Sequence, residues 1–113
     1  MLHVVLFQPE IPHNTGAIGR LCLATGARLH LIRPLGFSLE DKYLRRSGLD
    51  YWEHVDVHQW DSWEALRGSA TAGSTFYFIE CEGGTTYWEA KMTGDEVYLV
   101  FGPETRSIPP SII

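Results

Sequence analysis

Three short segments of the chain contain residue types that can bind a ligand or take part in a reaction. In the first, residues 9–20, an apolar stretch gives way to a helical pattern that includes Asn14, Thr15, Gly16 and Arg20. Backbone N–H groups at a helix N-terminus attract anions, and arginine adds a permanent charge that binds phosphate with two donors. We therefore expect free amides at 14–16, and we expect Arg20, one turn further on, to contact the same phosphate. A helix cap followed by a surface arginine is the alternative.

The other two segments are turns that follow strand-forming residues. Ile79 and Glu80 stand near the end of one such run, ahead of a pair of glycines, while Gly102 and Glu104 lie just after another. Ligands bind at the carboxyl edge of a parallel sheet, and glycine lets a ligand approach the backbone closely. We expect both turns to lie at that edge, with Glu104 accepting a hydrogen bond from a ligand or from Arg20. Solvent-exposed turns are the alternative.

Alternating strands and helices must position these segments. Apolar runs and shorter alternating patterns predict five strands, at 2–8, 28–32, 54–58, 75–81 and 96–101. Capping residues and helical spacing predict three helices, at 14–25, 38–47 and 62–67. Asn14, Ser38 and Asp61 are the expected caps, and Gly26 is the expected end of the first helix. The alternation predicts an α/β fold with a mainly parallel sheet and helices on both faces.

The composition fits a cytosolic globular domain. The chain has 113 residues, of which 44% are hydrophobic, so it can bury a core without a disulfide or a metal. Cys22 and Cys81 are too few for a metal cluster, and His54 and His58 lack a third ligand, so we expect no metal site. No apolar stretch approaches the ~20 residues of a membrane span. We expect one domain, over residues 1–113, in the cytoplasm and without membrane contact.

Charge is unevenly distributed along the chain. The formal net charge is -5, yet residues 1–46 contain six basic and three acidic residues, while the remainder contains three basic and eleven acidic ones. A basic front half is compatible with docking on a phosphate backbone. Arg45 and Arg46 are adjacent there and are candidates, together with Arg20, for binding RNA phosphates. A solvated charged surface is the alternative.

Several of these segments together resemble one family. Residues 14–20, Asn-Thr-Gly-Ala-Ile-Gly-Arg, and residues 101–106, Phe-Gly-Pro-Glu-Thr-Arg, are similar to motifs of the SPOUT superfamily of methyltransferases. Residues 6–12 and 44–52 are similar to its TrmL-type branch, the tRNA (cytidine/uridine-2'-O)-methyltransferases of the wobble position. The chain departs from the family at Ser107, where glycine is usual, and the family's third motif, Ser-x-Asn, is absent from the sequence.

The resemblance implies a fold, a cofactor and partners. The fold is a SPOUT-type α/β knot, in which a C-terminal segment threads a loop, an exception to the unknotted rule. S-adenosylmethionine would bind in the knot through backbone groups near Ile79, Glu80 and Gly102, and would leave as S-adenosylhomocysteine. The substrate would be a tRNA anticodon stem-loop, and the assembly a homodimer in which the cofactor of one subunit faces the other. Because residues 107–113 resemble an unfinished helix start, we expect the domain to be C-terminally incomplete here.

The implied reaction is an in-line attack of a ribose 2'-oxygen on the methyl carbon of the cofactor, which needs no metal. By resemblance Arg20 is the catalytic residue, with Asn14 and Glu104 fixing its direction. A guanidinium remains protonated up to a pH above about 12. We therefore expect Arg20 to hold the adjacent phosphate and stabilise the developing alkoxide, rather than to remove a proton.

Two other functions are weighed against this one. A nucleotide-binding oxidoreductase on a doubly wound sheet would require a Gly-x-Gly-x-x-Gly turn and an acidic ribose partner, and the turn at 14–19 does not supply that pattern. A non-catalytic RNA-binding module would share the fold but not the turnover. Asn14, Arg20 and Glu104 count against this second alternative, and a methyl-transfer assay on unmodified tRNA distinguishes such a module from the methyltransferase.

Overall fold

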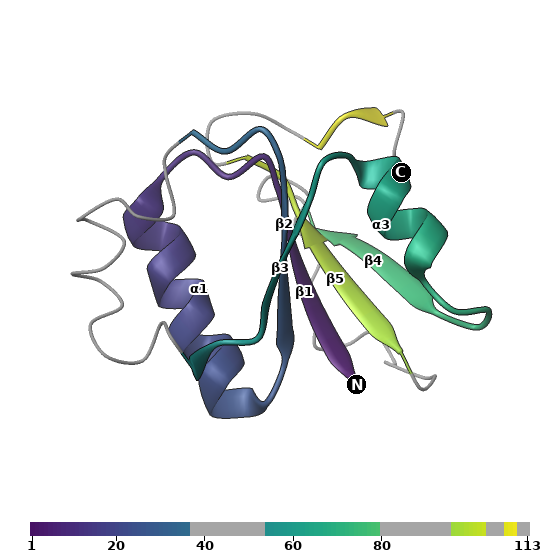
Figure 1. Ribbon diagram of the computed structural model, residues 1–113, viewed down its shortest axis with the longest axis horizontal. Helices are drawn as coiled ribbons and strands as arrows, with labels where there is room; N and C mark the ends of the chain where they lie inside the picture. Colours follow the sequence, from purple (N-terminus) through teal and green to yellow (C-terminus); the bar gives the residue numbers. More distant parts are fainter. Residues whose placement is uncertain (37–53, 80–95, 104–107, 111–113) are drawn as a thin grey trace.

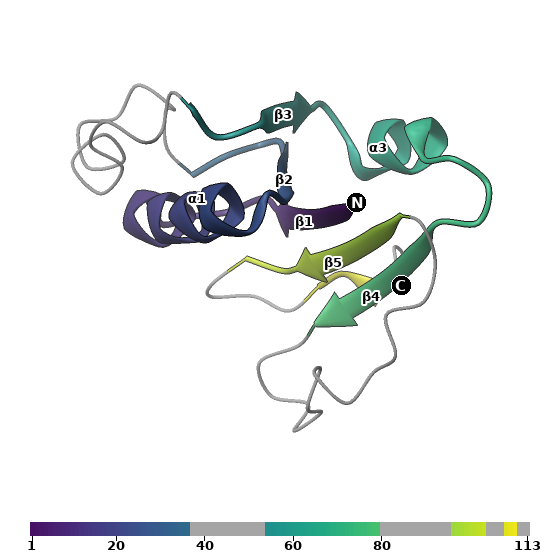
Figure 2. The same cartoon turned by 90° about the horizontal axis from the view of Figure 1, so that it is seen from below.

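Five parallel strands form the centre of the protein. The computed structural model describes residues 1–36, 54–79, 96–103 and 108–110. The strands are β1 (Leu2–Phe7), β2 (Arg28–Ile32), β3 (Val57–Trp60), β4 (Thr75–Ile79) and β5 (Val97–Phe101). They pair in the order β3-β2-β1-β5-β4, and every neighbouring pair is parallel (Figures 1 and 2). The predicted α/β fold with a mainly parallel sheet is therefore confirmed.

The strand order reverses at the centre of the sheet. β1 has β2 on one side, to which it is joined by α1 (Pro12–Thr25), and β5, the last of the described strands, on the other. The chain then leaves β3 through α3 (Trp63–Ser69) and reaches β4 at the far edge. In open α/β sheets ligands bind at the carboxyl ends of the two strands where the order reverses. Here those strands are β1 and β5.

One face of the sheet is covered by α1. Pro12 lies in the first turn of this helix, where its missing N–H costs no hydrogen bond. Gly26 ends the helix as predicted, in the left-handed conformation at φ 74°. On this face Cys22 of the helix belongs to a buried cluster with Leu6, Leu29 and Leu31 from β1 and β2.

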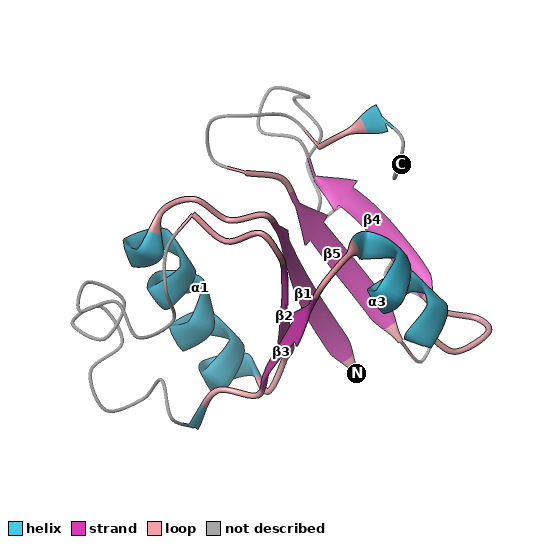
Figure 3. Ribbon diagram, turned by 45° about the horizontal axis from the view of Figure 1, so that its top comes forward, coloured by secondary structure: helices cyan, strands magenta, loops and turns pink. Residues whose placement is uncertain are grey.

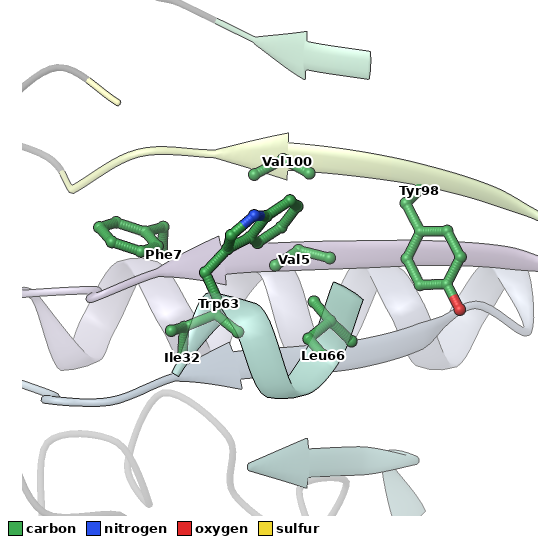
Figure 4. Close-up of a cluster of buried hydrophobic side chains, with 7 residues drawn as sticks. All are labelled: Val5, Phe7, Ile32, Trp63, Leu66, Tyr98 and Val100. Carbon is green, nitrogen blue, oxygen red and sulfur yellow. The ribbon is translucent and has the colours of Figure 1, made fainter. Parts of the chain in front are cut away.

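The opposite face is covered by α3, so the prediction of helices on both faces is also confirmed (Figure 3). Two of its residues, Trp63 and Leu66, are buried against strand side chains that alternate with those facing α1. Figure 4 shows this cluster of seven buried residues: Val5, Phe7, Ile32, Trp63, Leu66, Tyr98 and Val100. Because both faces of β1 are buried, its sequence is an almost unbroken apolar run.

The predicted bounds of β3 and of α3 are wrong at both ends. β3 begins at Val57 rather than at residue 54, because its pairing with β2 starts where Val57 lies opposite Leu29. α3 begins one residue late and ends at Ser69, and its cap is Ser62 rather than Asp61, since the Ser62 hydroxyl accepts from the Ala65 N–H at 3.1 Å. The predicted helix at 38–47, the end of the predicted strand at 80–81 and the cysteine at 81 lie outside the described residues.

Candidate active site

The carboxyl ends of three strands lie side by side at one edge of the sheet. Ile79 at the end of β4 is opposite Phe101 at the end of β5, and Phe101 is in turn opposite Leu6 of β1. Ile79 and Gly102, both predicted to bind the cofactor, therefore lie at neighbouring strand ends, which confirms their predicted placement on one edge. Glu80 and Glu104, the other two predicted site residues of these turns, lie outside the described residues.

Gly102 is close to another part of its own chain. A Cβ built on this residue would lie 2.8 Å from Cγ1 of Ile108 and 3.0 Å from the Ile108 backbone nitrogen. Ile108 is 2% exposed, so it cannot yield by moving into solvent. Glycine is therefore required at position 102 because a side chain would collide with Ile108, a reason that the sequence pattern did not reveal.

The turn after β1 carries unusual backbone geometry. Gln8 has φ 50°, a left-handed conformation that side chains other than glycine rarely adopt, and its N–H donates to the Ile32 carbonyl at 3.0 Å. Gly36, from the loop after β2, comes so close to the next residue of this turn that its N–H donates to the Pro9 carbonyl at 2.9 Å. A Cβ at Gly36 would lie 2.9 Å from the backbone Cα of Glu10. The loops that follow β1 and β2 are therefore held together, and this fixes the entry into α1.

α1 begins earlier than the sequence pattern predicts. Its cap is Ile11, with Pro12 in the first turn, so Asn14 is the third residue of the helix and not its cap. The Thr15 N–H already donates to the Ile11 carbonyl at 3.2 Å. The expectation that the amides of Asn14, Thr15 and Gly16 are all free is therefore wrong, because Thr15 already makes a helical hydrogen bond and Gly16 is the fifth residue of the helix. Proline outweighed asparagine because its fixed φ favours the first helical turn.

Arg20 lies deeper in the helix than one turn. It is the ninth residue of α1, about 9 Å along the axis from Asn14 and roughly 120° around it. Both residues are exposed. Since helical side chains lean toward the N-terminus, that of Arg20 extends over Gly16, four residues earlier, and so toward the carboxyl edge of the sheet. The helix alone does not place Asn14 beside Arg20.

Thr15 is a residue of this region that the sequence reasoning did not single out for its side chain. It is 0% exposed, and among the described residues its Oγ1 is the buried side-chain oxygen or nitrogen that has no hydrogen-bond partner. Its position, one turn before Ile18 and Gly19, predicts that it faces the sheet near the ends of β1 and β5. The periodic pattern of α1 would have indicated burial, but not the missing partner.

A cluster of polar side chains, which the sequence analysis did not predict, lies across the α3 face of the sheet and consists of Trp60, His30, His3 and Glu96. The Trp60 Nε1–H donates to His30 Nδ1 at 2.9 Å, which leaves the proton of neutral His30 on Nε2. His30 Nε2 then donates to His3 Nδ1 at 2.8 Å, and His3 Nε2 donates to Glu96 Oε2 at 2.5 Å. The ring of Tyr98 stacks on His3 at 4.0 Å between centroids. The hydrogen bonds thus run in one direction, from indole to carboxylate.

Burial governs the titration of both histidines. Desolvation, with the neighbouring His3 as a smaller cause, lowers the pKa of His30 to about 3. Desolvation also lowers the pKa of His3, although its hydrogen bond to Glu96 opposes this. His3 and Tyr98 stand near the beginnings of β1 and β5, toward the edge opposite the candidate site, whereas Trp60 is the last residue of β3. The hydrogen bonds of this cluster therefore connect side chains of β1, β2 and β3 across the sheet.

The described residues offer no metal centre. Within residues 1–36, 54–79, 96–103 and 108–110, no group of three or more His, Cys, Asp or Glu side chains is arranged to hold a metal ion. Cys22 is buried, and desolvation raises the pKa of its thiol to about 11, so the thiol is neutral at physiological pH. In the same part of the chain no helix is long and apolar enough to cross a membrane.

The protein is an α/β protein whose parallel sheet reverses its strand order between β1 and β5. A glycine turn and the N-terminus of α1 lie at the carboxyl edge of these strands. The chain belongs to the SpoU rRNA Methylase family, whose sequence pattern matches residues 1–113. The predicted SPOUT-type methyltransferase is therefore confirmed.

Individual relatives carry more specific names than the family does. The chain is 48% identical over 112 residues to the tRNA (cytidine(34)-2'-O)-methyltransferase of Methylovorus glucosotrophus, an alignment that covers 99% of this chain and 71% of that protein. It is 47% identical over 116 residues to the enzyme of the same name from Yersinia pestis, covering 100% and 72%.

Solved structures related to RNA methylation also superpose on this chain. One, from work on the 2-OH methylation of C/U34 on tRNA, superposes with a TM-score of 0.89 at 46% identity and covers 99% of this chain and 73% of its own. An rRNA methyltransferase from Sinorhizobium meliloti superposes with a TM-score of 0.79 at 20% identity, over 96% of this chain and 42% of its own. At that identity the likeness concerns the fold alone.

Proposed function

We propose that this protein is a tRNA 2'-O-ribose methyltransferase that modifies nucleotide 34, the wobble position, with S-adenosylmethionine as methyl donor. The observation that carries the proposal is the identity of 48% with a tRNA (cytidine(34)-2'-O)-methyltransferase over 99% of this chain. The carboxyl edge between β1, β5 and β4 supplies the place where such a reaction would be organised.

The residues at that edge fit the methyl donor. Ile79 and Gly102 lie at the ends of the neighbouring strands β4 and β5. Their backbone groups, with those of Glu80, would hold the cofactor. Thr15 adds a buried hydroxyl without a partner among the described residues. The cofactor supplies a methyl group on a positively charged sulfur. Backbone carbonyls and a hydroxyl oxygen suit such a ligand because their partial negative charge is compatible with the positive sulfonium.

Arg20 would act on the RNA rather than on the cofactor. The ribose 2'-oxygen forms a bond to the methyl carbon as the carbon–sulfur bond breaks, and the hydroxyl proton leaves to solvent or a base. Because guanidinium remains protonated, Arg20 would hold the neighbouring phosphate and stabilise the negative charge that develops on the oxygen. Asn14 and Glu104 would direct that side chain, and Arg45 and Arg46 would add phosphate contacts.

The proposal extends to the assembly and the domain. Leu21 is 62% exposed on α1, and Ile11 and Leu23 are each 39% exposed, so this helix presents apolar side chains to solvent. Apolar surface of this kind favours a protein interface, and we infer a homodimer with one methyltransferase domain per subunit. Because the proposed substrate is tRNA, we infer a cytoplasmic location. The knot stays a prediction.

The test is methyl transfer from labelled S-adenosylmethionine to unmodified tRNA by the full-length protein, with the label mapped to position 34. Arg20→Ala should reduce turnover by roughly 10²–10³-fold, because it removes a charge that stabilises the transition state. Its affinity for S-adenosylhomocysteine should stay the same. Arg67→Ala, an exposed arginine on the opposite face, is the matched control.

Two outcomes would contradict the proposal. Binding of tRNA without methyl transfer would favour the non-catalytic RNA-binding module. An equal loss of turnover and cofactor affinity in Arg20→Ala would place Arg20 in the cofactor pocket.

A further inference from the structure

Thr15 differs from the other serine and threonine residues within the two described helices, α1 and α3. Thr25, in the same helix, donates its hydroxyl to the Leu21 carbonyl at 2.8 Å, and Ser69 in α3 donates to the Leu66 carbonyl at 2.7 Å. Such bonds to the preceding turn are the usual arrangement for helical threonine and serine. Thr15 is 0% exposed and makes no such bond, so its hydroxyl is buried without a partner among the described residues.

A buried hydroxyl without a partner carries the full cost of its lost water, whereas valine of the same shape would not. Groups that lower stability in this way are found where a site requires them. The position of Thr15 indicates which site. Cys22, two turns later on the same face of α1, belongs to the buried cluster that includes Leu6, and Ile18 and Phe101 are partly buried side chains that pack against this cluster.

Because α1 runs back along the sheet, Thr15 lies beyond this cluster toward the strand ends. Phe101 is the last residue of β5 and leads directly into Gly102. Figure 1 shows the first turn of α1 at the edge where β1 and β5 end. The sheet-facing side of Thr15 is thus directed to the edge where the methyl donor is proposed to bind.

We propose that the Thr15 hydroxyl is a cofactor-binding group that hydrogen-bonds a polar atom of S-adenosylmethionine, since no other described residue is its hydrogen-bond partner. Burial favours the small ligand over the RNA: Asn14 and Arg20 on the same helix are exposed and accessible to a polynucleotide, whereas Thr15 is fully buried. This inference rests on the proposed function.

Two substitutions separate the hydroxyl from the shape of the side chain. Thr15→Val keeps the shape and removes the hydroxyl, whereas Thr15→Ser keeps the hydroxyl and removes a buried methyl group. We expect Thr15→Val to bind S-adenosylhomocysteine roughly three- to tenfold more weakly, the loss typical of one hydrogen bond. The free form of this variant should melt at the same temperature as the wild type or on the order of 4 °C higher.

Thr15→Ser should show the opposite pattern. Its affinity should stay within about twofold of the wild type, while its melting temperature should fall because a methyl group is lost from a buried position. Isothermal titration calorimetry with S-adenosylhomocysteine and thermal unfolding of the ligand-free full-length protein provide the two readouts. Neither depends on turnover.

The outcomes distinguish this inference from the proposed function. If the wild type itself binds neither S-adenosylhomocysteine nor S-adenosylmethionine, the proposed function fails. If the wild type binds but Thr15→Val binds equally well, the role of Thr15 is refuted. The inference is also refuted if Thr15→Val is less stable than Thr15→Ser, since the hydroxyl would then have a structural partner.

Discussion

Lowering the pH from 7 to 5 should destabilise the folded protein through the hydrogen-bonded chain Trp60–His30–His3–Glu96. Every ring nitrogen of the two histidines is already used: His30 Nδ1 accepts from Trp60, and His3 Nδ1 accepts from His30. A proton added to either accepting nitrogen turns it into a donor that faces a donor. The folded state therefore resists protonation, whereas the unfolded chain takes up protons at the ordinary pKa of histidine.

The magnitude follows from the pKa of His30, which is about 3 in the folded protein, whereas the ordinary pKa of histidine is 6.5. A lowered histidine pKa means that stability is fully present above pH 6.5 and is lost progressively as the pH falls toward 3. Between pH 7 and pH 5, His30 alone should remove about 2 kcal/mol of unfolding free energy. His3, whose pKa is also lowered, should add to the loss. Glu96 has a lowered pKa too, so it remains ionised in this range.

Urea unfolding at pH 7, 6 and 5 measures this effect directly. His30→Gln keeps an acceptor for Trp60 and a donor for His3 but cannot titrate, so its pH dependence should be smaller than that of the wild type by about 2 kcal/mol. His54→Gln, a change at an exposed histidine, should keep the wild-type dependence. A His30→Gln protein that loses as much stability as the wild type would refute the role of this chain of hydrogen bonds.

Three further experiments test other parts of the structure. Gly36→Ala should lower the unfolding free energy by roughly 1–3 kcal/mol, because its Cβ would lie 2.9 Å from the backbone of the loop before α1. Gly68→Ala, whose Cβ would have nothing within 4 Å, should instead raise the unfolding free energy by ~0.5–1 kcal/mol. Chemical denaturation compares the two, and equal effects would contradict the close approach. Leu21→Glu should convert the proposed dimer into a monomer in light scattering, and a monomeric wild type would remove the dimer proposal. Replacing Arg45 and Arg46 by alanine should reduce the salt slope of tRNA binding by about 1.4–1.8, and an unchanged slope would mean that neither contacts phosphate.

Local pattern in the sequence determined most of the fold. Apolar runs predicted β1, β2 and β5 to within a residue at either end, because a strand buried on both faces requires them. Gly26 ended the first helix as predicted, since the left-handed conformation favours glycine. The motifs at 14–20 and 101–106 were sufficient to predict the family. Where two local signals competed, at Pro12 and Asn14, the sequence alone did not decide between them.

Tertiary structure decided which distant residues meet. The start of β3 was set by its pairing with β2, not by the alternation of its own residues. Gly102 contacts Ile108 only because the chain turns back. His3 and His30 are separated by 27 residues and become partners because β1 and β2 pair with Val5 opposite His30. The unpartnered hydroxyl of Thr15 likewise depends on what the rest of the fold places around it, because a hydrogen bond requires two groups and the sequence near one of them does not specify the other.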